Sequence, residues 1–99
     1  MYLVVFRNRK RADINGADYS AAANRMEERA RAQPGFLSFK SFAADDGEVV
    51  AISEWESEAA ARSWGRDQEH AMIQGRGRSE WYAEYTLLAG SPDRIHRFP

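Results

Sequence analysis

The chain has 99 residues, which is the length of one domain, and its 43% apolar and 29% charged residues are typical of a folded protein. Its 14 Lys and Arg against 15 Asp and Glu give a formal net charge of −1, which argues against a general nucleic-acid binder. The absence of Cys excludes disulfides, thiolate metal sites and a Cys nucleophile, and no apolar run approaches the ~20 residues of a membrane span. We therefore expect a soluble, cytoplasmic protein that binds neither nucleic acid nor membrane.

Four segments have the residue pattern of β-strands, rich in β-branched and aromatic residues. A period of two in the last of them places Trp81 and Tyr85 on one face and Tyr82 on the other. The basic residues 7–11, after the first strand, predict a solvated loop. The predicted strands are residues 2–6, 36–43, 48–55 and 79–89.

Polar N-cap residues introduce three predicted helical segments. The third segment contains His70, and the pattern predicts that Gly75 and Gly77 end it. The predicted N-caps are Asp18 for a helix to about residue 32, Ser57 for a helix to about residue 64 or 66, and Asp67 for the third segment.

The order of these elements predicts a fold. Strands and crossover helices in the order β-α-β-β-α-β predict a ferredoxin-like α+β domain with an antiparallel sheet. Two helices cover only one face of such a sheet, yet the first, third and last strands have apolar residues on both faces. We therefore expect a homodimer, with the uncovered faces of two sheets in contact.

One family resemblance follows from local motifs. Residues 55–64 (WESEAAARSW), His70 and residues 77–82 (GRSEWY) resemble the antibiotic biosynthesis monooxygenase family, and Pro34-Gly35-Phe36 fits the same pattern. The resemblance covers residues 2–90. It implies a dimeric α+β barrel in which residues 1–99 form a single domain, with residues 91–99 as a short tail. Members of the family include cofactor-free monooxygenases of anthrones and quinols and haem-degrading enzymes.

The resemblance also implies site residues. Haem-degrading members use an Asn at the end of the first strand, a Trp in the second helix and a His after it. Asn8 and Trp64 lie near the first two positions, but Gln74 occupies the ligand position and His70 lies about one turn earlier. Because an amide is a poor iron ligand, haem is disfavoured, although a small gap in the alignment would restore His70 as the ligand. We expect no cofactor.

His70 is the candidate acid/base, because its side chain exchanges a proton near neutral pH. Trp64 would form the wall of an aromatic slot and Asn8, where the first strand leaves the sheet, a polar anchor. The structural alternatives are a His70 bonded to Asp67 or Glu69, a core Trp64 and a loop-closing Asn8.

Trp55, Trp81 and Arg78 are candidate substrate-binding residues. The alternative for the two tryptophans is the core or the dimer interface. Arg78 has its own alternative, an ion pair with Glu80 or Glu84.

These features predict a cofactor-independent monooxygenase of the antibiotic biosynthesis type that acts on a small aromatic or quinol-like molecule. Two alternatives remain open: a haem-binding or haem-degrading member of the family, and a non-catalytic dimeric module for small-molecule binding or stress.

Overall fold

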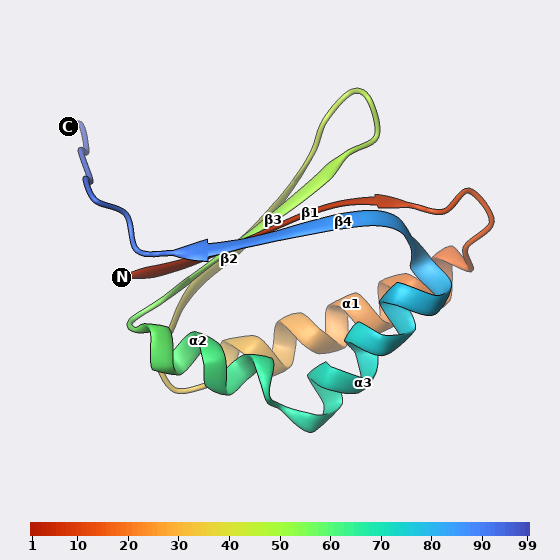
Figure 1. The fold of residues 1–99 in the computed structure, drawn as a ribbon, viewed down its shortest axis with the longest axis horizontal. Coiled ribbons are helices and arrows are strands. Elements are labelled where there is room, and N and C mark those ends of the chain that lie inside the picture. The colour runs from red at the N-terminus through yellow and green to blue at the C-terminus, as the bar shows by residue number, and fades with distance from the viewer.

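The computed structural model describes the backbone of residues 1–99 and the side chains of all of them except residues 68 and 69. A four-stranded antiparallel sheet of order β2-β3-β1-β4 has its helices on one face (Figure 1), which confirms the ferredoxin-like α+β fold. The elements are β1 (Tyr2–Lys10), α1 (Gly16–Arg31), β2 (Phe36–Ala43), β3 (Val49–Trp55), α2 (Glu58–Gly65), α3 (Gln68–Arg76), the π-helix η1 (Gly77–Trp81) and β4 (Tyr82–Gly90).

The helix starts follow the capping residues, with one correction. Ser57 and Asp67 cap α2 and α3 as predicted, through bonds from the backbone N–H groups of Ala60 and His70. Helix α1, however, is capped by Asn15, whose Oδ1 accepts from the Asp18 backbone N–H at 3.0 Å. Asp18 therefore lies in the first turn, where its carboxylate interacts favourably with the positive end of the helix dipole.

The predicted loop after the first strand is wrong, because β1 continues to Lys10. Arg7 and Arg9 lie on the sheet face away from the helices, where they pair with Glu48 at 3.1 Å and with Asp46 at 2.8 Å. Alternation along the strand thus lets a basic sequence remain in a sheet. Asn8 lies within β1, paired with both neighbouring strands, rather than where the strand leaves the sheet.

The predicted stop at Gly75 is wrong, and at Gly77 the α-helix ends as predicted but the chain stays helical. Helix α3 continues through Gly75 to Arg76 and widens into the π-helix η1, so β4 begins only at Tyr82. The Arg11 side chain secures this junction by donating hydrogen bonds to the backbone carbonyls of Arg78, Ser79 and Tyr82.

A register shift between β1 and β4 changes the predicted faces of the last strand. Arg9 pairs with Glu84 but Lys10 pairs with Tyr82, so Ala83 is one extra residue on β4. As a result Tyr82 lies on the same side as Tyr85, where the two rings are 5.9 Å apart. The strict period of two had placed them on opposite faces.

The core lies between the helices and the sheet, at the end of β3. Trp55 is fully buried against Ala30 and Ala61, and Trp64 packs on this cluster. Gly35, at φ +84°, lets the turn before β2 approach α2, since a Cβ there would lie 2.6 Å from that of Ala60. Among the described residues, no helix is both long enough and apolar enough to cross a membrane.

Candidate functional site

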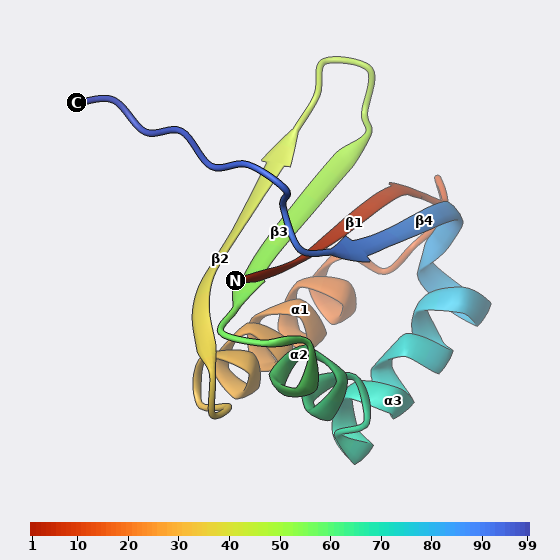
Figure 2. The same cartoon turned by 60° about the vertical axis from the view of Figure 1, so that its left-hand side comes forward.

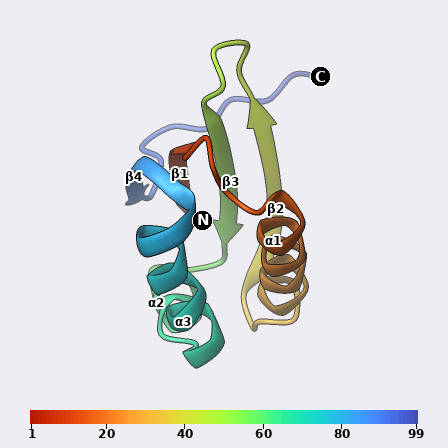
Figure 3. The same cartoon turned by 90° about the vertical axis from the view of Figure 1, so that its right-hand side faces the viewer.

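A cavity of about 600 Å³ lies between the sheet and the helices that face it. Figures 2 and 3 show these two layers, the sheet and the helices, from two further directions. Its walls are mainly aromatic and small apolar side chains, as in sites for flat organic molecules. All six residues proposed from the sequence line it: Asn8, Trp55, Trp64, His70, Arg78 and Trp81.

His70 is held in one orientation by α2 and α3. Its Nδ1 lies 2.9 Å from the backbone carbonyl oxygen of Trp64, and its ring stacks on the Trp64 indole at 4.2 Å and 14°. Because a carbonyl only accepts, Nδ1 carries the proton and donates it. The other nitrogen, Nε2, is therefore a bare acceptor in neutral His70, and no interaction within the described structure occupies it.

The electrostatics keep this imidazole neutral. Burial lowers the pKa of His70, while its bond to the Trp64 carbonyl and the Asp67 carboxylate oppose that shift. The alternative in which His70 bonds Asp67 applies only to its backbone N–H; the Glu69 side chain lies outside the described residues.

Three aromatic groups form one continuous wall. Trp55 and Trp64 are 6.4 Å apart and nearly parallel, and His70 extends the stack. Trp81 is buried too, and packs edge-on against Tyr19 at 5.4 Å. The three tryptophans therefore belong to the core and line the cavity at the same time.

Asn8 is 3% exposed, and both ends of its amide are bonded. Its Nδ2 donates to the Val49 carbonyl at 3.4 Å, and its Oδ1 accepts from Lys10 Nζ at 2.5 Å. Lys10 also lies over the rings of Tyr19 and Tyr82, at 4.7 and 5.5 Å. The oxygen of Asn8 thus accepts from Lys10, and its amide nitrogen, which has two hydrogens, has one left to donate.

Sequence reasoning missed Lys10, Tyr19 and Tyr82 as neighbours of the site. Burial raises the pKa of the Tyr82 phenol, and the adjacent Tyr19 adds to that shift. Continued alternation past Phe6 would have placed Lys10 on the same face as Asn8, but the run of basic residues had indicated a loop.

The alternative ion pairs of Arg78 are wrong. Glu80 pairs with Arg76 at 2.7 Å, and Glu84 pairs with Arg9 at 3.4 Å. The guanidinium of Arg78 has no ion pair or hydrogen bond within the described residues. It lines the cavity and is also exposed to solvent, so it lies at the cavity mouth.

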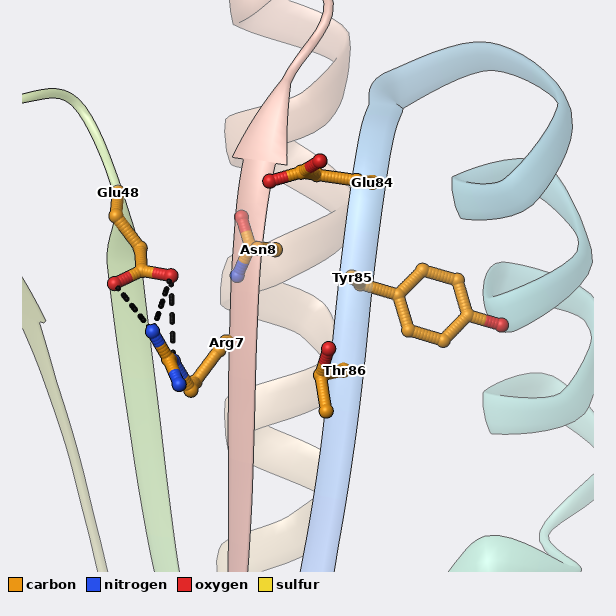
Figure 4. A pocket seen from close by; sticks show the side chains of 6 residues that line it. All are labelled: Arg7, Asn8, Glu48, Glu84, Tyr85 and Thr86. Carbon is orange, nitrogen blue, oxygen red and sulfur yellow. Dashed lines mark hydrogen bonds and ion pairs between the residues drawn. The ribbon is translucent and has the colours of Figure 1, made fainter.

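A second hollow, of about 220 Å³, is polar and lies over β1, β3 and β4 (Figure 4). The figure shows that Arg7 and Glu48, which both line it, are bonded to each other. Because their charges are already compensated, the larger cavity is the better candidate site.

Two features of the site concern metal ions and haem. Within the described part of the chain, no three His, Asp or Glu side chains gather where they could hold a metal ion. Gln74 lines the cavity at the position where the family resemblance places the haem ligand, and its amide is a poor ligand for iron.

The comparisons agree with the geometry. The model of the antibiotic biosynthesis monooxygenase family matches residues 1–76. The uncharacterised protein YqjZ of Bacillus subtilis is 35% identical over 97 residues, covering 98% of this chain and 83% of YqjZ. The chain belongs to the antibiotic biosynthesis monooxygenase family.

Two solved structures share the fold. Rv0793 from Mycobacterium tuberculosis superposes with a TM-score of 0.82 at 18% identity, over 97% of this chain and 98% of its own. SnoaB, a cofactor-independent oxygenase from Streptomyces nogalater solved as a mutant, gives a TM-score of 0.79 at 17% identity. That match covers 95% of this chain and 94% of SnoaB.

Proposed function

We propose that this protein is a cofactor-independent monooxygenase of a small aromatic or quinol-like substrate. The observation that supports this most is the bare Nε2 of His70 in a cavity walled by Trp55 and Trp64. A neutral, oriented imidazole beside a flat aromatic wall suits proton abstraction from a phenol or an enol. Family membership and the likeness to SnoaB support oxygenation without a cofactor.

The chemistry needs only the substrate and dioxygen. His70 Nε2 takes the proton of a phenolic or enolic hydroxyl, which makes the ring carbon electron-rich. The anion passes electrons to dioxygen and forms a peroxide at that carbon. Loss of water then leaves a carbonyl, so an anthrone CH₂ and O₂ become C=O and H₂O. The imidazolium returns its proton to the departing oxygen, which restores neutral His70.

The surrounding residues serve this reaction by position. Trp64 holds the imidazole in place, because the two rings are stacked, and together with Trp55 it offers aromatic surface to a flat substrate. The second N–H of the Asn8 amide donates to a substrate carbonyl in this proposal, while Lys10 holds the amide oxygen. The mainly apolar walls limit the water that would compete for the proton.

Oxygen uptake with an anthrone or a hydroquinone tests the proposal. We expect His70→Ala to lower turnover by ~10²–10⁴-fold, the usual contribution of a general base. Because burial lowers the pKa of His70, the acidic limb of the wild-type rate profile should lie below about pH 6.5 and vanish in the variant. His96→Ala, in the exposed tail, is the matched control.

Unchanged turnover in a folded His70→Ala variant would remove His70 from the mechanism. Binding of aromatic compounds with no oxygen uptake would instead indicate a binding module. Added haem tests the haem-binding alternative. A sharp Soret band that His70→Ala abolishes would show that His70, not Gln74, ligates iron.

A further inference from the structure

The charged residues of the large cavity differ in whether their charge is compensated. Among the described residues that line it, Glu27 pairs with Arg31 at 3.5 Å and Arg62 pairs with Glu58 at 2.8 Å, each within its own helix. Arg78 has no such partner. Among the described residues that line the cavity, Arg78 is therefore the charged side chain without a counter-ion; Lys10 lies behind the lining, against Asn8 and the rings of Tyr19 and Tyr82.

This charge has a fixed place relative to His70. His70, Gln74 and Arg78 follow one another at intervals of four residues along α3 and the start of η1, and all three line the cavity. Four-residue intervals keep side chains on one side of a helix, and the α-helical rise separates His70 from Arg78 by about 12 Å along the axis. One wall thus presents a base, an amide and a guanidinium in a row.

The backbone that supports Arg78 is itself held. The Arg78 carbonyl accepts from Nη2 of Arg11 at 3.2 Å, and the Ser79 carbonyl accepts from Nη1 of the same side chain at 2.9 Å. Strand β1 leads into this arginine, so the sheet fixes the turn from which the Arg78 side chain projects. A guanidinium whose backbone is held in place is suited to bind a planar carboxylate through two parallel hydrogen bonds.

We propose that the substrate is an elongated, flat aromatic acid, whose carboxylate binds Arg78 at the cavity mouth while its hydroxyl reaches His70. This inference rests on the proposed function, because it assigns the substrate class of the same site. What it adds is the carboxylate of the substrate, which neither the oxygenase chemistry nor the aromatic wall requires. The amide of Gln74 lies between the two ends and contacts the middle of the ring system.

Binding of two matched probes tests the proposal without any turnover. The first is 6-hydroxy-2-naphthoate, which has a hydroxyl at one end and a carboxylate at the other, and the second is its neutral methyl ester. We expect the acid to bind wild type more tightly than the ester in calorimetry. Arg78→Gln should weaken the acid about tenfold and leave the ester unchanged.

Two further variants sharpen the result. Arg78→Lys should recover part of the affinity, because lysine keeps the charge but loses the paired hydrogen bonds. Arg66→Gln, which removes another exposed arginine outside the lining of the cavity, should bind both probes like wild type. Added salt should weaken the acid with wild type and much less with Arg78→Gln.

Equal binding of acid and ester, failure of the acid to bind, or equal losses for both probes in Arg78→Gln would overturn the proposal. The test also separates the two proposals. Charge-selective binding through Arg78 without oxygen uptake from any hydroxylated aromatic acid would reject the oxygenase and keep the anion site.

Discussion

The tautomer of His70 is set by a backbone carbonyl, and this decides what the residue contributes. Nδ1 is occupied by the Trp64 carbonyl, so Nε2 is the nitrogen left to accept a proton, on a side chain that lines the cavity. Stacking on Trp64 removes much of the ring from water, and that burial outweighs the Asp67 carboxylate in setting the direction of the pKa shift. The same shift links His70 to stability.

We expect His70 to lower the free energy of unfolding as the pH falls. Burial lowers the folded-state pKa of His70 below its unfolded value, so the unfolded chain binds the proton first. The contribution is complete above about pH 6.5 and decreases as the pH falls from there toward the folded-state pKa, by at most ~1.4 kcal/mol per pH unit.

Guanidinium unfolding at fixed protein concentration, between about pH 6.5 and 5, measures this slope. His70→Gln should flatten it, and His96→Gln in the exposed tail is the control. A slope that survives His70→Gln would assign the effect to other groups.

The candidate residues could be named from sequence because their chemistry is uncommon in this chain. With two His and three Trp, few residues are able to take a proton or form an aromatic slot. The committed oxygen of Asn8 and the unpaired charge of Arg78 could not be predicted. The first depends on β1 continuing through Lys10, which the basic sequence did not indicate. The second depends on competition, because Arg76 takes Glu80 within the helix and Arg9 takes Glu84 across the sheet.

At the scale of elements, strands and helix caps followed the sequence, whereas the junction between α3 and β4 did not. Glycine usually ends a helix because it accepts positive φ, but Gly75 and Gly77 are helical here. Gly77 is needed for space instead, since a Cβ at that position would lie 2.6 Å from the ring of Tyr82. No local pattern reveals a requirement that comes from a packed side chain.

Gly77→Ala should therefore destabilise the protein by about 1–3 kcal/mol, the usual range for overpacking. The displaced Tyr82 ring packs against Phe6 and Tyr85, so it has little room to move. Gly75→Ala is the matched control: its Cβ would meet only Arg78 Nη2, at 4.0 Å, and alanine favours a helix by up to about 1 kcal/mol. Urea unfolding measures both, and a Gly77→Ala variant as stable as Gly75→Ala would contradict the steric argument.

At the scale of the whole molecule, the sheet has one face with no helix on it (Figure 1). By alternation and register, the residues on that face include apolar side chains on the three strands β1, β3 and β4. They are Leu3, Val5, Val50, Ile52 and Leu88. Leu88 is 51% exposed, and apolar side chains gathered on one sheet face form the kind of patch that marks an interaction site.

We propose that a second copy covers this face, and we expect light scattering at micromolar concentration to report about twice the chain mass of 11.3 kDa. Ile52→Arg should give a monomer, because it buries a charge in the proposed contact. Met72→Arg, at a residue 70% exposed on α3 and away from that face, should remain dimeric. A wild-type chain that stays monomeric and folded would rule out the dimer.

The junction between α3 and β4 limits how the length of this chain can vary. With Ala83 deleted, Tyr82 would directly precede Glu84 and would pair with Lys10 as before, so its ring would keep its side of the sheet and only the bulge would be lost. A deletion within η1 would instead convert the wide turn to an ordinary α-turn and rotate α3, with His70 and Gln74, by about 100° relative to the sheet. Relatives that keep this cavity are therefore expected to place insertions and deletions elsewhere, such as the β2–β3 turn or the tail after Gly90.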